Sequence, residues 1–148
     1  QRIIIKSIGG FLPRLLLEKK MSYYYPEYVR LSTAAGDNDN VSICFHERME
    51  VVGAKIVDFA GVAAHTANIA TFQVLASDKT NVLLEWKTET GQQGALAANV
   101  SADMVDQGHS DKAIFEAGEP VIVKVVKASS GQVTNTCICL QLRQARSY

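Results

Sequence analysis

The chain has 148 residues, and its 15 Lys and Arg residues balance its 15 Asp and Glu residues, so the formal net charge is zero. A chain of this length is typical of one domain, which buries roughly 70% of its unfolded surface and needs no disulfides to form a core. The charge is unevenly spread: residues 1–20 hold five Lys or Arg against one Glu, and residues 21–148 hold ten against fourteen acidic residues. Because nucleic-acid binding depends on clustered Lys and Arg, this acidic body argues against a nucleic-acid partner.

The first twenty residues, QRIIIKSIGGFLPRLLLEKK, are basic and apolar. Lys6, Gly9-Gly10 and Pro13 divide the apolar residues into runs far shorter than the roughly 20 that a membrane span requires, so we expect no membrane partner. The segment also lacks the continuous apolar centre and the cleavage site of a secretory signal. Two interpretations stay open. Either Met21 is the true start and the residues before it translate a ribosome-binding site, or the segment is a basic arm that docks on a neighbouring subunit.

A tyrosine-rich stretch, SYYYPEY, follows the basic segment. Tyrosine combines a large apolar ring with a polar tip at low entropic cost, which is why it is enriched at protein interfaces. Side chains alternate between the faces of a strand, so Tyr24 points away from Tyr23 and Tyr25, and at least one ring meets solvent or a partner. We therefore predict an interface at Tyr23, Tyr24, Tyr25 and Tyr28. Packing of this stretch across the chain's own domain is the alternative.

From residue 28 onward, short runs rich in Val, Ile, Thr and aromatic residues recur at a spacing of roughly eight to twelve residues, which is the pattern of an all-β sandwich or barrel. The strands expected in the first half are YVRLST (28–33), VSICFH (41–46), VVGAKIVDFAG (51–61) and NIATFQVLA (68–76). In VSICFH, the apolar Val41, Ile43 and Phe45 share one face, which places His46 on the outer face.

The second half continues the pattern after the turn SDKTN. VLLEWKTET (82–90) alternates as a strand with one buried face, and we expect Trp86 in the core. GALAANVSADM (94–104) is ambiguous, because its alanines suit a helix, but its position between two polar turns favours a strand. A further strand begins after the turn EAGEP, with Val121, Val123 and Val125 on one face.

The turn ASSGQ (128–132) predicts a hairpin between strands 121–128 and 133–143, with both arms supplying core to one sheet. In the second arm, Ile138, Leu140 and Leu142 point inward and the residues between them outward, or the reverse.

The expected architecture is all-β: a single antiparallel β-sandwich or jelly roll of eight or nine strands. No repeated motif and no Pro/Ser linker divides it. We place an N-terminal arm at residues 1–27, basic and apolar and then tyrosine-rich, and the β-sandwich domain at residues 28–148.

No catalytic signature is found in the sequence, which lacks the nucleophile-elbow, phosphate-loop and zinc-protease motifs. His109 and Asp111 would need a distant serine to make a triad, and their Gly and Asp neighbours indicate a polar loop instead. Asp37 and Asp39 in GDNDN alternate as calcium ligands do, but the full twelve-residue loop is missing and a turn is favoured. We therefore predict a protein that is not an enzyme and has no cofactor.

The three cysteines leave one over from any pairing, and two of them share one face of a strand, where they are poorly aimed at each other. We expect reduced, packed thiols at Cys44, Cys137 and Cys139. The three histidines show no ligand spacing around the Cys-x-Cys pair, so no metal site is predicted.

The segment 50–143 resembles the small β-sandwich virion proteins of tailed bacteriophages, the capsid decoration or cement proteins. The stretches that carry the resemblance are ERMEVVGAKIVDFAG, TFQVLA, NVLLEWKT, AGEPVIVKVV and TNTCICLQLR. In that family an Ala-Gly turn introduces an apolar strand, followed by a short hairpin into a final alternating strand, and Ala117-Gly118 with strands 121–128 and 133–143 match this pattern. Tumour-necrosis-factor-like jelly rolls share it.

The resemblance implies a non-enzymatic protein on the capsid surface of a virion, a homo-oligomer with a trimer favoured. Its partner would be the major capsid protein or another virion protein, and its role would be to reinforce the lattice. The alternative is a carbohydrate- or receptor-binding module of a tail fibre, using loops around Trp86 or GQQG (91–94).

Overall fold

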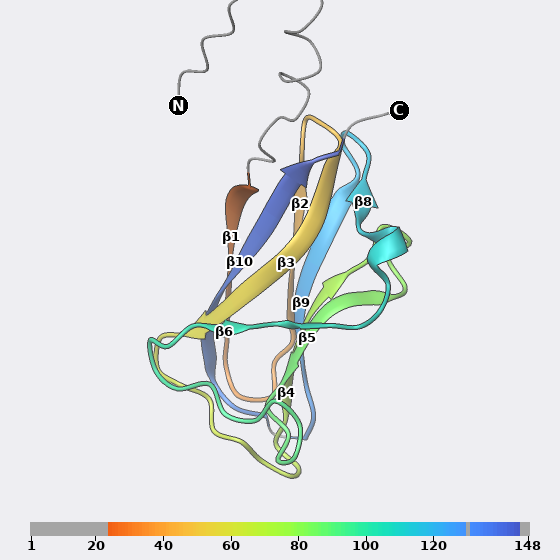
Figure 1. Cartoon of the computed structure of the whole chain (residues 1–148). Coiled ribbons are helices and arrows are strands. Elements are labelled where there is room, and N and C mark those ends of the chain that lie inside the picture. The colour runs from red at the N-terminus through yellow and green to blue at the C-terminus, as the bar shows by residue number, and fades with distance from the viewer. Residues whose placement is uncertain (1–23, 130, 146–148) are drawn as a thin grey trace, which may run out of the picture.

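The computed structural model describes residues 24–129 and 131–145. These residues form two antiparallel sheets of five strands each, which pack against each other around one apolar core (Figure 1). The prediction of an all-β sandwich is confirmed. The described residues include one short 3-10 helix, η1 (Ser110–Lys112), and no helix among them is long and apolar enough to cross a membrane.

The first sheet has the order β1 (Tyr24–Thr33), β10 (Thr134–Gln144), β3 (Met49–Asp58) and β6 (Ala102–Asp103), and β8 (Ile114–Phe115) also pairs with β3. The second sheet has the order β2 (Asp39–Cys44), β9 (Pro120–Lys127), β4 (Ala70–Leu75), β5 (Val82–Lys87) and β7 (Val105–Asp106). The described part of the chain thus has ten strands where eight or nine were expected. Three of them, β6, β7 and β8, have two residues each and are too short to leave a periodic pattern.

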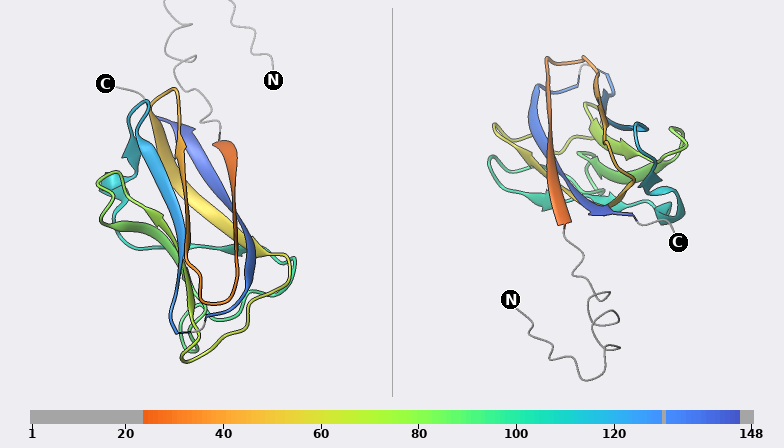
Figure 2. Two further views of the ribbon diagram at one scale, coloured as in Figure 1. Left: turned by 180° about the vertical axis from the view of Figure 1, so that it is seen from behind. Right: turned by 90° about the horizontal axis from the view of Figure 1, so that it is seen from above.

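The strands pair by a nested rule: β1 with β10, β2 with β9, β3 with β6, and β4 with β5, all antiparallel. These pairs arise when one long hairpin, closed at β4 and β5, is rolled up, which brings β10 beside β3 and β9 beside β4. This is the strand order of a jelly roll. Figure 2 shows the two layers from behind and from above.

The core lies between the sheets, where the alternating apolar residues of both layers meet. Val121, Val123 and Val125 of β9 are fully buried, as are Ile138 and Leu140 of β10. The face of β9 predicted to supply core is confirmed, and of the two orientations left open for β10 the structure has the one with Ile138, Leu140 and Leu142 inward. Because a shift of one residue would turn these apolar side chains to solvent, burial fixes the register of each strand.

The predicted hairpin between β9 and β10 is wrong. β9 pairs with β2 and β4 in the second sheet, and β10 pairs with β1 and β3 in the first. The segment between them therefore crosses from one sheet to the other. The alternating pattern shows only that each strand buries one face, which is equally satisfied by strands that lie side by side and by strands that face each other across the core.

The strand predicted for residues 94–104 is wrong over most of its length, because only Ala102–Asp103 forms β6. Leu96 exchanges two backbone hydrogen bonds with Val62, at 2.8 and 2.9 Å. Asn99 then adopts a left-handed conformation with φ of 59°, which interrupts extended backbone. The segment buries only the side chains of Leu96 and Met104, which are eight residues apart, instead of an alternating row.

β1 begins at Tyr24, so residues 24–27, which the sequence suggested as part of the arm, pair with residues 140–143 of β10. Pro26 is compatible with this strand because β1 is an edge of the first sheet, where a missing backbone N–H is tolerated. Residues 1–23 lie outside the described residues, and both interpretations of residues 1–20 stay predictions.

Candidate interaction surface

Two of the four tyrosines predicted as an interface are exposed on β1: Tyr25 is 50% exposed and Tyr28 is 66% exposed. Tyr28 lies on the outer face of the first sheet, whereas Tyr25 is in phase with the buried Val29 and lies at the open end of the sandwich. Tyr24 is the first residue of β1. Tyr23 lies outside the described residues. The edge strand therefore presents two large rings to solvent, and their role as an interface stays a prediction.

A groove of about 420 Å³ opens beside Tyr25, and we call it the Tyr25 groove. Three separate segments form its walls: the start of β1, the connection from β2 into β3, and the end of β10. Its apolar lining residues are Tyr25, Pro26, Phe45, Met49 and Leu142. Its polar lining residues are Glu27, His46 and Glu47. No local sequence signal marks the groove, because the walls come together only in the folded chain.

The outer face of the first sheet places Tyr28, Cys139 and Lys55 in one row across β1, β10 and β3. The Lys55 ammonium donates to a carboxylate oxygen of Asp103 at 2.7 Å, and both side chains are largely exposed. An exposed pair of this kind contributes little to stability. The row thus ends in a satisfied ion pair and begins with an exposed aromatic ring.

The next row along the same face contains Arg30 and Cys137. The Arg30 guanidinium donates to the Asn135 side-chain oxygen at 3.0 Å and lies 5.8 Å from the centre of the Phe59 ring. Phe59 is 44% exposed. The sequence pattern predicted Phe59 as part of the strand 51–61 and did not indicate that its ring is exposed beneath a cation.

The thiols of Cys137 and Cys139 are free and half-buried on this face, and Cys44 is free and exposed on the second sheet. Partial burial raises the pKa of the Cys137 thiol, with a further contribution from Cys139 and an opposing one from Arg30. A raised pKa keeps the thiol protonated and unreactive at neutral pH. The prediction of free, packed thiols thus holds for Cys137 and Cys139, whereas for Cys44 the thiol is free but exposed, so the expectation that it is packed is wrong.

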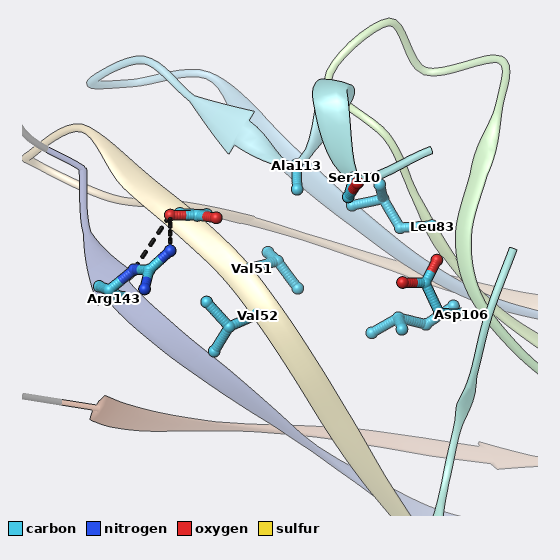
Figure 3. A pocket seen from close by; sticks show the side chains of 9 residues that line it. Val51, Val52, Leu83, Asp106, Ser110, Ala113 and Arg143 are labelled. Carbon is cyan, nitrogen blue, oxygen red and sulfur yellow. Dashed lines mark hydrogen bonds and ion pairs between the residues drawn. The ribbon is translucent and has the colours of Figure 1, made fainter. Parts of the chain in front are cut away.

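A second cavity, of about 290 Å³, lies between β3 and the strands β5 and β7 (Figure 3). The Arg143 guanidinium pairs with a Glu50 carboxylate oxygen at 2.6 Å on one side, and Asp106 lies on the other side with apolar side chains between them. The Asp106 carboxylate accepts the backbone N–H of Gly108 at 2.7 Å. The described residues that line this cavity include Ser110 and no histidine or cysteine.

The histidines weighed as chemical groups are dispersed. His109 precedes η1 and lies beside Asp111 in a polar loop, as expected. The His65 Nδ1 accepts the backbone N–H groups of Ala67 and Asn68, each at 3.0 Å, so this ring organises a turn, a role the sequence did not indicate. Within residues 24–129 and 131–145, no group of three or more His, Cys, Asp or Glu side chains is arranged to hold a metal ion.

Trp86 packs against the core from β5, and its indole N–H donates to the Gly94 carbonyl at 3.2 Å. The Gln93 side-chain oxygen accepts the backbone N–H of Lys87 at 2.8 Å. GQQG is thus folded back onto β5. The expectation that Trp86 is a core residue is supported by this half-buried packing.

No protein-family model matches the chain, and no curated protein sequence is significantly similar to it. Among solved structures, a chain of desmodium yellow mottle tymovirus is 8% identical with a TM-score of 0.34, and the match covers 97% of this chain and 93% of that one. A chain from the structure of maize chlorotic mottle virus is 12% identical with a TM-score of 0.35, covering 87% and 96%. At TM-scores this low the likeness carries no argument about function, which is argued below from the chain's own surface.

Proposed function

We propose that the chain is a non-enzymatic structural protein of a virion, a decoration or cement protein. It sits on the capsid surface, binds the major capsid protein and stabilises the lattice, as a homo-oligomer for which a trimer is favoured. The jelly-roll order supports the class, because viral capsid domains are one group of proteins that use it. The space between the two sheets is filled by apolar side chains. A partner would therefore bind the outer surface, which agrees with a structural role.

The observation that carries the proposal is the exposure of Tyr25 and Tyr28 on a strand paired with β10 along its whole length. A ring held on a rigid strand loses little entropy when a partner covers it, which makes tyrosine an efficient interface residue. Several copies attached to one lattice would add avidity to contacts that are individually modest.

The test is the double variant Tyr25→Ser/Tyr28→Ser, mixed with capsids assembled from the major capsid protein of the same virus. We expect unchanged circular dichroism and melting, and at least about tenfold weaker binding in cosedimentation, since each lost aromatic contact costs on the order of 1 kcal/mol or more. Decorated capsids should also open at a lower temperature with the variant than with the unchanged protein.

The matched control is Val126→Ser/Val133→Ser, which removes one exposed apolar side chain from β9 and another from the connection just before β10. Binding equal to that of the unchanged chain is expected for this control. Full occupancy of the capsid by the tyrosine variant would contradict the proposed contact. If capsids are not bound but a glycan array is, the carbohydrate-binding module suggested by the sequence replaces the proposal.

A further inference from the structure

The Tyr25 groove combines an apolar floor with an acidic rim. Met49 and Leu142 are buried at its base, and Phe45 packs against the core from one side. A concave surface of about 420 Å³ is within the size range of ordinary binding pockets, roughly 300–1,000 Å³. Its apolar lining gains free energy when another apolar group displaces water from it.

The rim carries two carboxylates and neither lysine nor arginine among the described residues that line the groove. Glu47 accepts a hydrogen bond from the Gln144 side chain at 2.9 Å, and no cation among residues 24–129 and 131–145 forms an ion pair with it. The Glu27 carboxylate has no hydrogen-bond or ion-pair partner within the described part of the chain. The groove is therefore suited to an occupant that is apolar and positively charged.

One segment of this chain has that composition. Residues 11–20, FLPRLLLEKK, hold Phe11 and four leucines, with Arg14, Lys19 and Lys20 against one glutamate. The segment lies outside the described residues and precedes β1, which begins at the groove. Extended chain spans about 3.3 Å or more per residue, so residues 1–23 are long enough to reach a neighbouring molecule.

The sequence between residues 11–20 and β1 indicates that these residues bind the groove of a second copy more readily than the groove of their own copy. Tyr25 lines the groove and lies only five residues after Lys20, so occupation of its own groove requires a sharp reversal within residues 18–23. Of the residue types that favour a tight reversal, these residues contain only Ser22 and no Gly, Pro, Asn or Asp, and serine favours turns more weakly than Asn or Asp. A groove on a neighbouring copy imposes no such turn.

We propose that the Tyr25 groove binds residues 11–20 of a second copy of this chain, with leucine side chains on its apolar floor and Lys19 and Lys20 facing Glu27 and Glu47. This inference deepens the homo-oligomer named in the proposed function and does not depend on attachment to a capsid. It also assigns the role of an intersubunit arm to the basic segment.

The experiment mixes unlabelled and ¹⁵N-labelled full-length chain without capsids, followed by zero-length carbodiimide crosslinking and mass spectrometry. We expect amide crosslinks from Lys19 or Lys20 to Glu27 or Glu47 in mixed light–heavy pairs. Crosslinks found only within one isotope population would assign the groove to the chain's own segment and overturn the proposal. Their complete absence, or a native protein whose intact mass begins at Met21, would also overturn it.

Two variants test the same contact by sedimentation. Glu27→Lys/Glu47→Lys replaces attraction by repulsion, and we expect self-association to weaken about tenfold. Leu15→Asp/Leu16→Asp changes the binding segment and no residue of the described sandwich. We expect this variant to weaken self-association as well. The matched control is Asp37→Lys/Asp111→Lys, two exposed acids outside the groove, which changes the net charge equally and should leave self-association unchanged.

These outcomes separate the two proposals. Loss of self-association in the groove variants, with capsid binding by single copies retained, supports the arm contact and leaves the capsid proposal standing. Unchanged sedimentation of both variants overturns the arm contact, whatever the capsid assay shows.

Discussion

Asp58 is fully buried at the end of β3, and its carboxylate accepts four hydrogen bonds. One oxygen accepts the backbone N–H groups of Ala60 at 2.9 Å and Gly61 at 2.8 Å. The other accepts the backbone N–H of Asn135 at 2.9 Å and the Thr136 hydroxyl at 2.7 Å. A single side chain thus ties the turn after β3 to the start of β10.

Replacing Asp58 by alanine leaves these buried donors without a partner, and each such group costs roughly 1–3 kcal/mol. We expect Asp58→Ala to lower the free energy of unfolding by about 3 kcal/mol or more, measured by urea denaturation. Asp103→Ala, which removes only the exposed partner of Lys55, should cost less than about 1 kcal/mol. Equal effects of the two substitutions would contradict this role for Asp58.

Asp78 organises the turn between β4 and β5 from an exposed position. Its carboxylate accepts the backbone N–H groups of Asn81 and Thr80, and the Lys112 ammonium lies 2.9 Å away. The pKa of Asp78 lies well below its ordinary value. The largest cause is the backbone hydrogen bond from Asn81, followed by the side-chain hydrogen bond from Lys112 and the backbone hydrogen bond from Thr80. The folded state therefore binds the proton at this site more weakly than the unfolded chain does.

Because the pKa of Asp78 is lower in the folded protein, its contribution to stability is present above the unfolded value, about 4, and is lost as the pH falls toward the lowered value. We expect Asp78→Asn to melt at a lower temperature than the unchanged chain at pH 7. The difference should shrink as the pH is lowered through the acid range in a series of thermal melts. A difference that is constant with pH would show that the charge of Asp78 is not the cause.

At the scale of elements, the connection from β9 to β10 determines how the two sheets are joined. The Lys127 ammonium donates to the Ala34 carbonyl at 2.6 Å, and its backbone N–H donates to the Asn38 side chain at 2.8 Å. Gly131 follows with φ of 55°. A Cβ atom at Gly131 would lie 2.8 Å from the Cβ of Lys127, so the crossing needs glycine for space as well as for conformation.

Gly131→Ala should therefore destabilise the protein by about 1–3 kcal/mol more than Gly118→Ala. Both glycines have positive φ and share the conformational cost, but a Cβ at Gly118 meets nothing within 4 Å. Chemical denaturation of the two variants measures the difference directly. Indistinguishable midpoints would mean that the backbone at the crossing moves away from Lys127 without cost.

At the scale of the whole molecule, the two sheets form one cooperative unit because they share one core. Phe72 of β4 is fully buried and belongs to the same cluster as Val123 of β9 and Leu140 of β10. Neither sheet can keep its apolar face out of water without the other. The three cysteines are free, so no disulfide among the described residues replaces this packing.

Phe72→Ala should lower the free energy of unfolding by about 3–5 kcal/mol, a large part of the 5–15 kcal/mol typical of a domain. We expect fluorescence and far-ultraviolet circular dichroism to report one coincident transition in both proteins. Val105→Ala, at an exposed position, is the control and should be nearly neutral. Two separate transitions would show that the sheets unfold independently.

The sequence by itself determined the class of the fold and most of the inward faces. Strands with period-two alternation, such as the one through Val121 and Val123, reveal their buried side locally, because burial of alternate residues is a property of the strand alone. Alternation does not explain the exposure of Tyr25, which is in phase with the buried Val29. The short strands and the irregular segment around Leu96 were not visible in the sequence, because single contacts leave no period.

Only the tertiary structure decided which strands are neighbours. The sequence suggested a hairpin for β9 and β10, and the structure places them in opposite sheets, since alternation specifies a face but not the strand beside it. The Tyr25 groove also depends on which strands become neighbours. Its walls come from the start of β1, the connection from β2 into β3 and the end of β10, and the pairing of β1 with β10 brings Tyr25 and Leu142 together.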